Sequence, residues 1–133
     1  MKAVFADTSF YIALTNERDG RHAQAQAVAD NLHIQTITTD YVLIEVGNWM
    51  SRSGDRPAFL RLLDQLLSDA YTTIVPATRE LLVNGLDLYR RRPDKDWSVT
   101  DCISYVVMED HGITEALTAD RHFEQAGFTI LLK

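Results

Sequence analysis

The sequence has almost no cysteine and no long apolar run. Cys102 is the only cysteine, so an intrachain disulfide is excluded, and we interpret this thiol as part of the core. No apolar stretch reaches the roughly 18 residues of a membrane-spanning helix, and the first residues lack the hydrophobic region of a signal peptide. We therefore expect a cytoplasmic protein without membrane association.

An excess of positive charge is also missing. The formal net charge of -6 at pH 7 argues against general adhesion to nucleic acids or anionic membranes, but it leaves room for a local basic rim or a cation site. Of the 133 residues, 46% are hydrophobic and 24% are charged, as is ordinary for a globular protein. We expect one domain, residues 1–133, with a single core.

Short apolar segments alternate with helical patterns. The predicted strands cover residues 2–7, 34–38, 71–75, 116–120 and 128–132. The predicted helices cover residues 9–15, 22–32, 40–53, 78–89 and 98–111, with one more starting at 55–57 and a helical turn near 122–124. This alternation predicts a three-layer α/β/α sandwich with a mostly parallel sheet, for which we expect the order 3-2-1-4-5. Ligands of such sheets bind beyond the carboxyl ends of the strands, where the strand order reverses.

The helix that starts at 55–57 has several leucines. We expect its apolar face to consist of Leu60, Leu63, Leu66 and Leu67.

The segment 96–112 places an acid beside a core helix. The apolar stripe of this helix, which Gly112 ends, consists of Val99, Cys102, Ile103, Val106 and Val107. Asp101 lies in the first turn beside the stripe, where an unpaired carboxylate costs on the order of several kcal/mol. For Asp101 taken alone, a capping box with Ser98 is the preferred explanation, and only the other acids of the chain favour a functional role.

Three further acids occupy comparable positions. Asp7 and Asp120 end predicted strands, and Glu45 lies at i+3 from Val42 and i-4 from Trp49, on a helix stripe that we expect to be buried. Each acid alone could be a cap, a turn residue or a paired surface acid. Together, at one end of the predicted sheet, they are harder to explain by structure alone.

Carboxylates held close together repel one another unless a cation neutralises them. Oxygen ligands without histidine or cysteine suit Mg²⁺ or Mn²⁺. A carboxylate-held metal that keeps water ligands is suited to phosphodiester hydrolysis, because it activates water and stabilises charge on phosphate.

The ordered set of Asp7-Thr-Ser, Glu45, Asp96-Trp-Ser-Val-Thr-Asp-Cys and Leu117-Thr-Ala-Asp-Arg-His-Phe resembles the PIN-domain ribonucleases. The particular resemblance is to the VapC-type toxins of bacterial toxin-antitoxin pairs, and it covers nearly the whole chain. It implies an α/β/α sandwich and a Mg²⁺- or Mn²⁺-dependent endoribonuclease acting on structured or messenger RNA. It also implies a homodimer and a small antitoxin protein as partner.

The resemblance also assigns roles to individual residues. Metal coordination, directly or through water, falls to Asp7, Glu45, Asp101 and Asp120. Supporting hydroxyls that orient carboxylates or bind water are Thr8, Ser9, Ser98 and Thr118. Asp96 stands where only some members have an extra acid, and we include it as a supporting residue.

Contacts with the substrate are less defined. A basic rim that binds RNA phosphates could consist of Arg90, Arg91, Arg92, Lys95 and Arg121, although arginines also favour the ends of helices for structural reasons. Trp97 could stack on an unpaired base, but we expect it to be buried beside the sheet. None of the four histidines (His22, His33, His111 and His122) shows the spacing of a metal site, and we assign them no catalytic role.

Two other functions compete with a ribonuclease that leaves a 5′-phosphate and a 3′-hydroxyl. An aspartyl-phosphate site, as in haloacid dehalogenase-type phosphatases or receiver domains, also places an acid after the first strand. The second acid that such a phosphatase needs is replaced by Ser9. A protein-binding module with the same fold would gain nothing from four mutually repelling acids.

Overall fold

The computed structural model describes residues 2–31 and 33–133. Its centre is a five-stranded sheet of order β3-β2-β1-β4-β5, and neighbouring strands pair in parallel. The strands are β1 (Val4–Ala6), β2 (Thr36–Thr39), β3 (Thr72–Val75), β4 (Glu115–Leu117) and β5 (Thr129–Ile130). The predicted fold class and strand order are confirmed.

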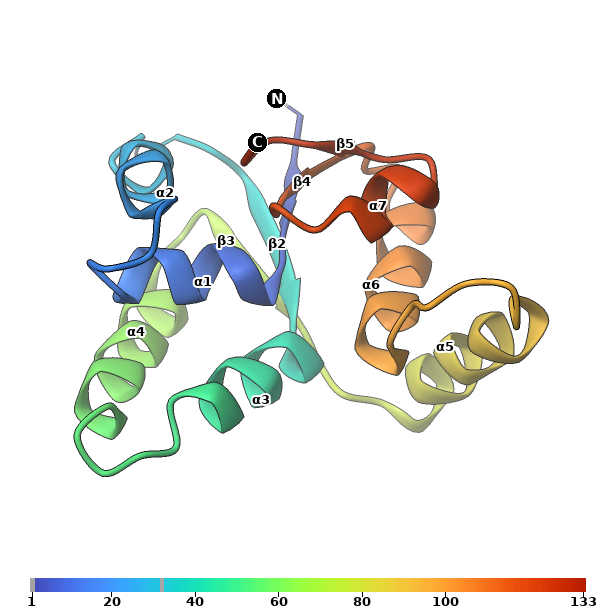
Figure 1. The fold of residues 1–133 in the computed structure, drawn as a ribbon, viewed down its shortest axis with the longest axis horizontal. Helices are drawn as coiled ribbons and strands as arrows, with labels where there is room; N and C mark the ends of the chain where they lie inside the picture. Colours follow the sequence, from blue (N-terminus) through green and yellow to red (C-terminus); the bar gives the residue numbers. More distant parts are fainter. Residues whose placement is uncertain (1, 32) are drawn as a thin grey trace.

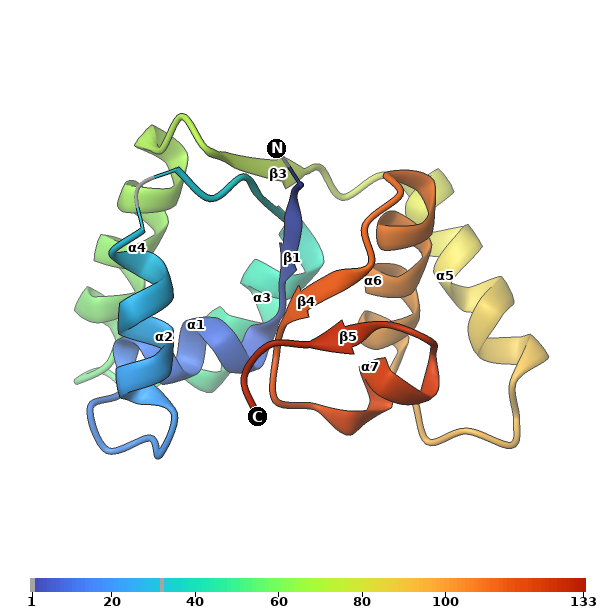
Figure 2. The ribbon, with the colours of Figure 1, turned by 90° about the horizontal axis from the view of Figure 1, so that it is seen from above.

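Helices flank the sheet on two sides (Figures 1 and 2). One group contains α1 (Thr8–Thr15), α2 (His22–Ala29), α3 (Asp40–Trp49) and α4 (Arg56–Ser68). The other contains α5 (Arg79–Arg91), α6 (Val99–Asp110) and α7 (Arg121–Gln125). None of the helices in the described residues is long and apolar enough to cross a membrane.

Several predicted boundaries were wrong. The strands are shorter than predicted, and two of them are displaced along the chain. Strand β2 ends at Thr39, one residue later than predicted, and β4 covers Glu115–Leu117, so it ends three residues before Asp120. The second helix ends at Ala29, and the predicted extension to residue 32 ends outside the described residues. Helix α5 continues to Arg91, two residues beyond the predicted end, so Arg90 and Arg91 belong to its last turn.

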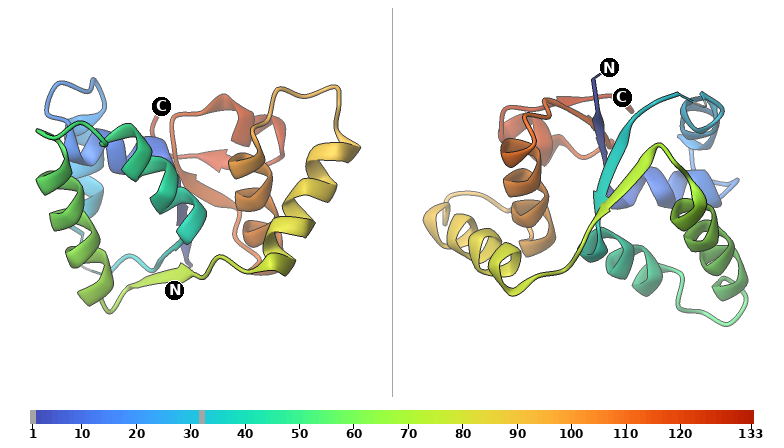
Figure 3. Two further views of the ribbon diagram at one scale, coloured as in Figure 1. Left: turned by 90° about the horizontal axis from the view of Figure 1, so that it is seen from below. Right: turned by 180° about the vertical axis from the view of Figure 1, so that it is seen from behind.

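Helix α6 lies between the sheet and α5, and most of its residues are buried. Figure 3 shows α5 lying alongside α6. This close approach requires a glycine, because a Cβ at Gly85 would collide with the side chain of Ile103. Gly112 ends the segment with φ of 65°, a backbone conformation that glycine adopts easily, as predicted from its position.

The apolar face of α4 differs from the prediction. Leu62 is buried and Phe59 and Leu66 pack partly against the core, whereas Leu60 is 56% and Leu67 is 67% exposed. The helix has more apolar residues than one face can hold, so its spacing admits more than one buried stripe. The prediction was wrong for Leu60 and Leu67 and correct for Leu66.

Candidate metal centre

Asp7 follows β1 and is 5% exposed. It occupies the N-cap position of α1, yet its side chain makes no capping hydrogen bond there. Instead, Asp7 Oδ2 accepts a hydrogen bond of 2.9 Å from Thr118 Oγ1, and Thr118 directly follows β4, the neighbour of β1. Ser9 Oγ lies 3.0 Å from the same Thr118 hydroxyl. Two of the predicted supporting hydroxyls therefore meet beside this carboxylate.

Asp101 is buried in the first turn of α6 and completes the predicted capping box. Its backbone N–H donates to Ser98 Oγ at 3.0 Å, and the Ser98 N–H donates to Asp101 Oδ2 at 3.2 Å. The cap leaves Oδ2 only 3.7 Å from the ring of His122. Capping and membership of the cluster are thus compatible, because the cap holds the carboxylate in place.

Asp120 and His122 lie on the more open side of the cluster. Asp120 caps α7, with its Oδ1 accepting the N–H of His122 at 2.9 Å, and its own N–H donates to Thr118 Oγ1 at 3.0 Å. His122 Nδ1 is 3.4 Å from Asp120 Oδ1. The sequence reasoning missed this histidine. The available signal was its position two residues after a predicted metal ligand, in the first turn of a helix that this ligand caps.

Glu45 is half-buried on α3, and the prediction about its surroundings was partly wrong. Val42 and Val46 are fully buried, but Trp49, which we expected on the same buried stripe, is 70% exposed. Only the first part of α3 is covered on this face. Glu45 is nevertheless close enough to raise the pKa of Asp7 and of Asp101 by charge repulsion, although burial and other neighbours have larger effects.

The surroundings of Asp7 and Asp101 disfavour the ionised form of both carboxyl groups. Burial and the negative charge of Asp101 raise the pKa of Asp7 to about 7, against an ordinary value of 3.8. Burial, together with the charges of Asp120 and Glu45, also raises the pKa of Asp101. A carboxylate with these surroundings needs either a proton or a cation.

The donor set fits a divalent cation. Asp101, Asp120 and His122 each offer one ligand atom, and these atoms lie within 4.8 Å of one another. The carboxylate oxygens are hard donors of the kind that Mg²⁺ and Mn²⁺ bind. The hydroxyl of Thr8, another predicted supporting residue, is buried and has no hydrogen-bond partner among the described residues.

The remaining predicted residues lie farther from these contacts. Asp96 is exposed, and no side-chain hydrogen bond among the described residues joins it to the cluster. Trp97 is buried as expected, packs edge-on against Tyr105 and donates its indole N–H to Gln125, so it cannot stack on a base.

The basic residues differ in their pairing. Arg91 pairs with Asp87 at 3.0 Å, and Arg92 pairs with Asp94 at 3.0 Å. Arg90 and Arg121 are exposed, and Lys95 is half-exposed. Their predicted contact with RNA stays a prediction.

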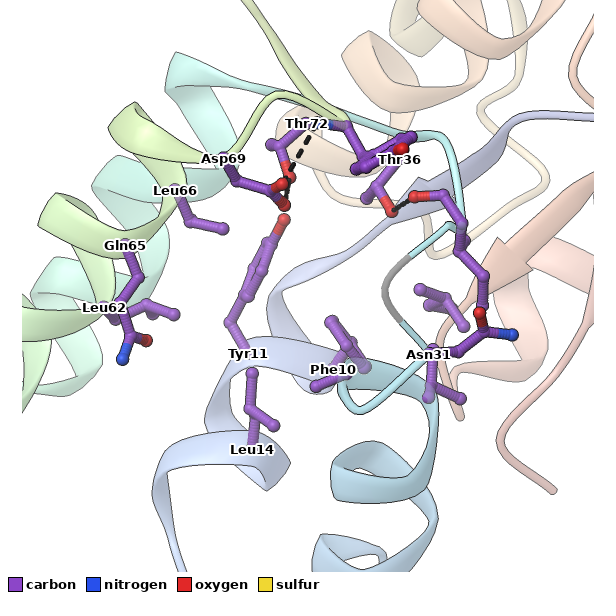
Figure 4. Close-up of a pocket in the computed structure, with 15 residues that line it drawn as sticks. Phe10, Tyr11, Leu14, Asn31, Thr36, Leu62, Gln65, Leu66, Asp69 and Thr72 are labelled. Carbon is purple, nitrogen blue, oxygen red and sulfur yellow. Dashed lines mark hydrogen bonds between the residues drawn. The ribbon is translucent and has the colours of Figure 1, made fainter.

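A separate hollow lies between α1, α2 and α4 (Figure 4). Phe10, Leu14 and Leu66 are among its apolar lining residues, and the hydroxyl of Tyr11 points toward the carboxylate of Asp69. None of the four predicted metal ligands lines it. The hollow is therefore distinct from the acidic cluster.

A parallel α/β/α sandwich with acids gathered beyond the ends of β1 and β4 defines a class of doubly wound α/β proteins, whose ligands bind at this edge of the sheet. Within this class, the chain belongs to the PIN domain family, whose sequence pattern matches residues 4–129.

Two relatives come from Mycobacterium tuberculosis, strains CDC 1551 / Oshkosh and ATCC 25618 / H37Rv. Both are 23S rRNA-specific endonuclease VapC20, and each is 29% identical over 126 residues, covering 94% of this chain and 95% of the relative. The crystal structure of VapC20 from M. tuberculosis, a sarcin-ricin loop cleaving toxin, has a TM-score of 0.85 at 28% identity, covering 96% of this chain and 97% of that one.

A more distant solved structure shares the fold. VapBC2 from Rickettsia felis, bound to a DNA fragment from its promoter, has a TM-score of 0.68 at 14% identity, covering 97% of each chain. At this identity the likeness is evidence for the fold alone.

Proposed function

We propose that the chain is a divalent-metal-dependent endoribonuclease and the toxin of a toxin-antitoxin pair. The observation that carries the proposal is the gathering of the buried Asp7 and Asp101 with Asp120 at one edge of the sheet. Burial and the charge of Asp101 raise the pKa of Asp7 to about 7, an effect that a bound cation would reverse. The endonuclease activity that the name of VapC20 describes supports RNA as the substrate. We propose Asp7, Glu45, Asp101 and Asp120 as the metal ligands and Mg²⁺ or Mn²⁺ as the ion.

The protein residues would hold the reacting groups in position. The Thr118 hydroxyl orients Asp7 through its bond to Oδ2, and the capping box fixes Asp101. When bound, the divalent ion supplies activation of water and neutralisation of charge on the scissile phosphate. The chain's own contribution is to keep the carboxylates close together before any ligand arrives, so that no rearrangement is needed at reaction.

Asparagine variants of Asp7 and Asp101 test the proposal. Each should lose cleavage of an RNA hairpin with the sarcin-ricin loop sequence in Mg²⁺ or Mn²⁺, by a factor of at least about 100, while the circular dichroism spectrum stays that of the parent. Asp64→Asn, on the exposed side of α4, is the matched control and should cleave normally. Cleavage that persists in both site variants, or that EDTA does not stop, would refute the proposal.

The products distinguish this enzyme from other ribonucleases. Attack by water should leave a 5′-phosphate and a 3′-hydroxyl, which a kinase-labelling assay can identify. A 2′,3′-cyclic phosphate at the end of the product would mean that the ribose hydroxyl attacks instead of water.

We infer that the basic residues near the site bind RNA phosphates and that they contribute unequally to the affinity for RNA. Arg91 and Arg92 already pair with acids, whereas no ion pair among the described residues involves Arg90, Lys95 or Arg121. Replacing a phosphate-contacting residue by glutamine should weaken RNA binding and reduce the slope of log K against log salt by about 1. Arg121→Gln is the most informative variant, because Arg121 directly follows Asp120.

We also propose protein partners, a second copy of the chain and a small antitoxin. Large apolar side chains are exposed on three helices: Ile44 and Trp49 on α3, Leu60 and Leu67 on α4, and Val83, Leu86 and Tyr89 on α5. Such exposure is typical of protein-protein contacts. Sedimentation of the purified chain should show a dimer that Trp49→Ser or Tyr89→Ser weakens. A monomer at all concentrations would refute the homodimer.

A further inference from the structure

His122 places its imidazole at the edge of the acidic cluster. The hydrogen bond from its backbone N–H to Asp120 Oδ1 holds the first turn of α7 against that carboxylate. Its Nδ1 lies 3.4 Å from Asp120 Oδ1 and 3.7 Å from Asp101 Oδ2. The side chain is 34% exposed, so an ion from solvent can reach the ring.

These separations suit a shared cation better than hydrogen bonds. N–H···O bonds in proteins span about 2.7 to 3.2 Å, and both contacts are longer. Two neighbouring ligands of one ion with bonds of about 2.1 Å lie about 3.0 Å apart in an octahedron and about 3.4 Å apart in a tetrahedron. The separation of His122 Nδ1 from Asp120 Oδ1 matches the tetrahedral value, the separation from Asp101 Oδ2 is 0.3 Å longer, and the ligand atoms of all three residues lie within 4.8 Å of one another.

We propose that His122 Nδ1 is a ligand of the ion held by Asp101 and Asp120, and that this nitrogen raises the affinity of the site for Zn²⁺ relative to its affinity for Mg²⁺. The inference rests on the proposed metal-dependent function. Imidazole is a good ligand for Zn²⁺ and other late transition metals, whereas Mg²⁺ prefers oxygen donors and water. The carboxylates alone would bind either ion, and His122 adds affinity for only one of them.

Calorimetric titration with Zn²⁺ and with Mg²⁺ tests the proposal. His122→Ala should weaken Zn²⁺ binding by at least about tenfold and change Mg²⁺ binding by less than about twofold. His111→Ala is the matched control, because His111 is exposed at the end of α6, and both affinities should stay those of the parent. Equal losses for the two ions, or no loss for Zn²⁺, would overturn the inference.

A second measurement needs no variant. In the ¹⁵N spectrum of the parent protein, Zn²⁺ should shift the Nδ1 resonance of His122. The Nδ1 resonance of His22, which contacts the backbone oxygen of Ala13 at 2.8 Å, should stay in place. Zn²⁺ binding without a change at His122 would overturn the inference even if the alanine variant failed to fold.

Failure of this inference can be told apart from failure of the proposed function. If the parent binds Mg²⁺ and cleaves RNA while the histidine measurements are negative, only the role of His122 is wrong. If the parent binds neither ion, both the metal-dependent function and the histidine ligand are refuted.

Discussion

Replacing Asp7 with asparagine should stabilise the metal-free protein at pH 8. The carboxyl group is 5% exposed, and burial together with the charge of Asp101 raises its pKa to about 7. Asparagine has nearly the same shape and keeps an oxygen for the 2.9 Å hydrogen bond from Thr118 Oγ1. The substitution therefore removes the charge and leaves the packing almost unchanged.

The direction and size of the effect follow from the two pKa values. Because the pKa of Asp7 is higher in the folded protein than its ordinary 3.8, the folded state binds the proton more tightly. This contribution to stability is complete below pH 4 and is lost as the pH rises through 7. Between the two pKa values, each pH unit changes the free energy of unfolding by about 1.4 kcal/mol. The stability lost between pH 5 and pH 8 is therefore about 3 kcal/mol at most.

Urea unfolding at pH 5 and pH 8 in EDTA measures the effect. The free energy of unfolding of the parent should fall more than that of Asp7→Asn, by up to about 3 kcal/mol, and Asp64→Asn should behave like the parent. At pH 8, Mn²⁺ at 100 times its dissociation constant should restore about 2.7 kcal/mol to the parent. It should restore much less to Asp7→Asn. Parallel pH dependence in the parent and Asp7→Asn would show that Asp7 is not under electrostatic strain.

Three further predictions concern the helices that support the site. Gly85→Ala should lower the free energy of unfolding by about 1 to 3 kcal/mol, because the new methyl group collides with Ile103. Gly54→Ala is the control, because a methyl group there meets open space and should cause no such loss. Equal urea midpoints for the two variants would contradict this packing. Ser98→Ala should cost about 1 kcal/mol through loss of the capping box of α6, and an unchanged thermal midpoint would mean that the cap is dispensable. The thiol of Cys102, which is fully buried, should react with Ellman's reagent only in urea, and rapid labelling of the native protein would show that α6 opens.

The positions of three acids could be predicted from local patterns, whereas the expected strand order came from the resemblance to the PIN-like fold. Asp7 directly follows a buried strand, Asp120 lies just beyond another, and Ser98 marks the start of the helix that contains Asp101. In a parallel sheet the carboxyl ends of neighbouring strands lie at one edge, so the order of the strands brings these residues together. No knowledge of side-chain packing was needed for this step.

Faces of helices were harder to predict than their positions. Trp49 and Leu67 have the spacing of buried residues, yet both are largely exposed. Periodicity identifies which residues share a face, but the end of a helix can extend beyond the element it packs on, and a helix with many leucines offers more than one apolar face. How much of a helix face is buried depends on the neighbouring elements, and the spacing of residues along one helix gives no information about them.

The place of His122 beside the acidic cluster escaped prediction because we considered only the spacing among histidines along the sequence. Its partners in space are Asp120, two residues away, and Asp101, which lies on another helix. A search that combines residue types at one edge of the sheet would have included it. Contacts between residues far apart in the sequence can be predicted only after the strand order has placed those residues in space.

Helix capping explains why Asp101 and Asp120 are acids, but it does not explain the charge of Asp7. Asp101 and Asp120 each accept a backbone N–H at the start of a helix, so the fold itself benefits from them. Asp7 caps nothing, and burial beside Asp101 works against its ionised form. A neutral asparagine would serve the fold better at this position. The carboxylate is therefore best explained by a ligand that requires negative charge, and a divalent cation meets that requirement.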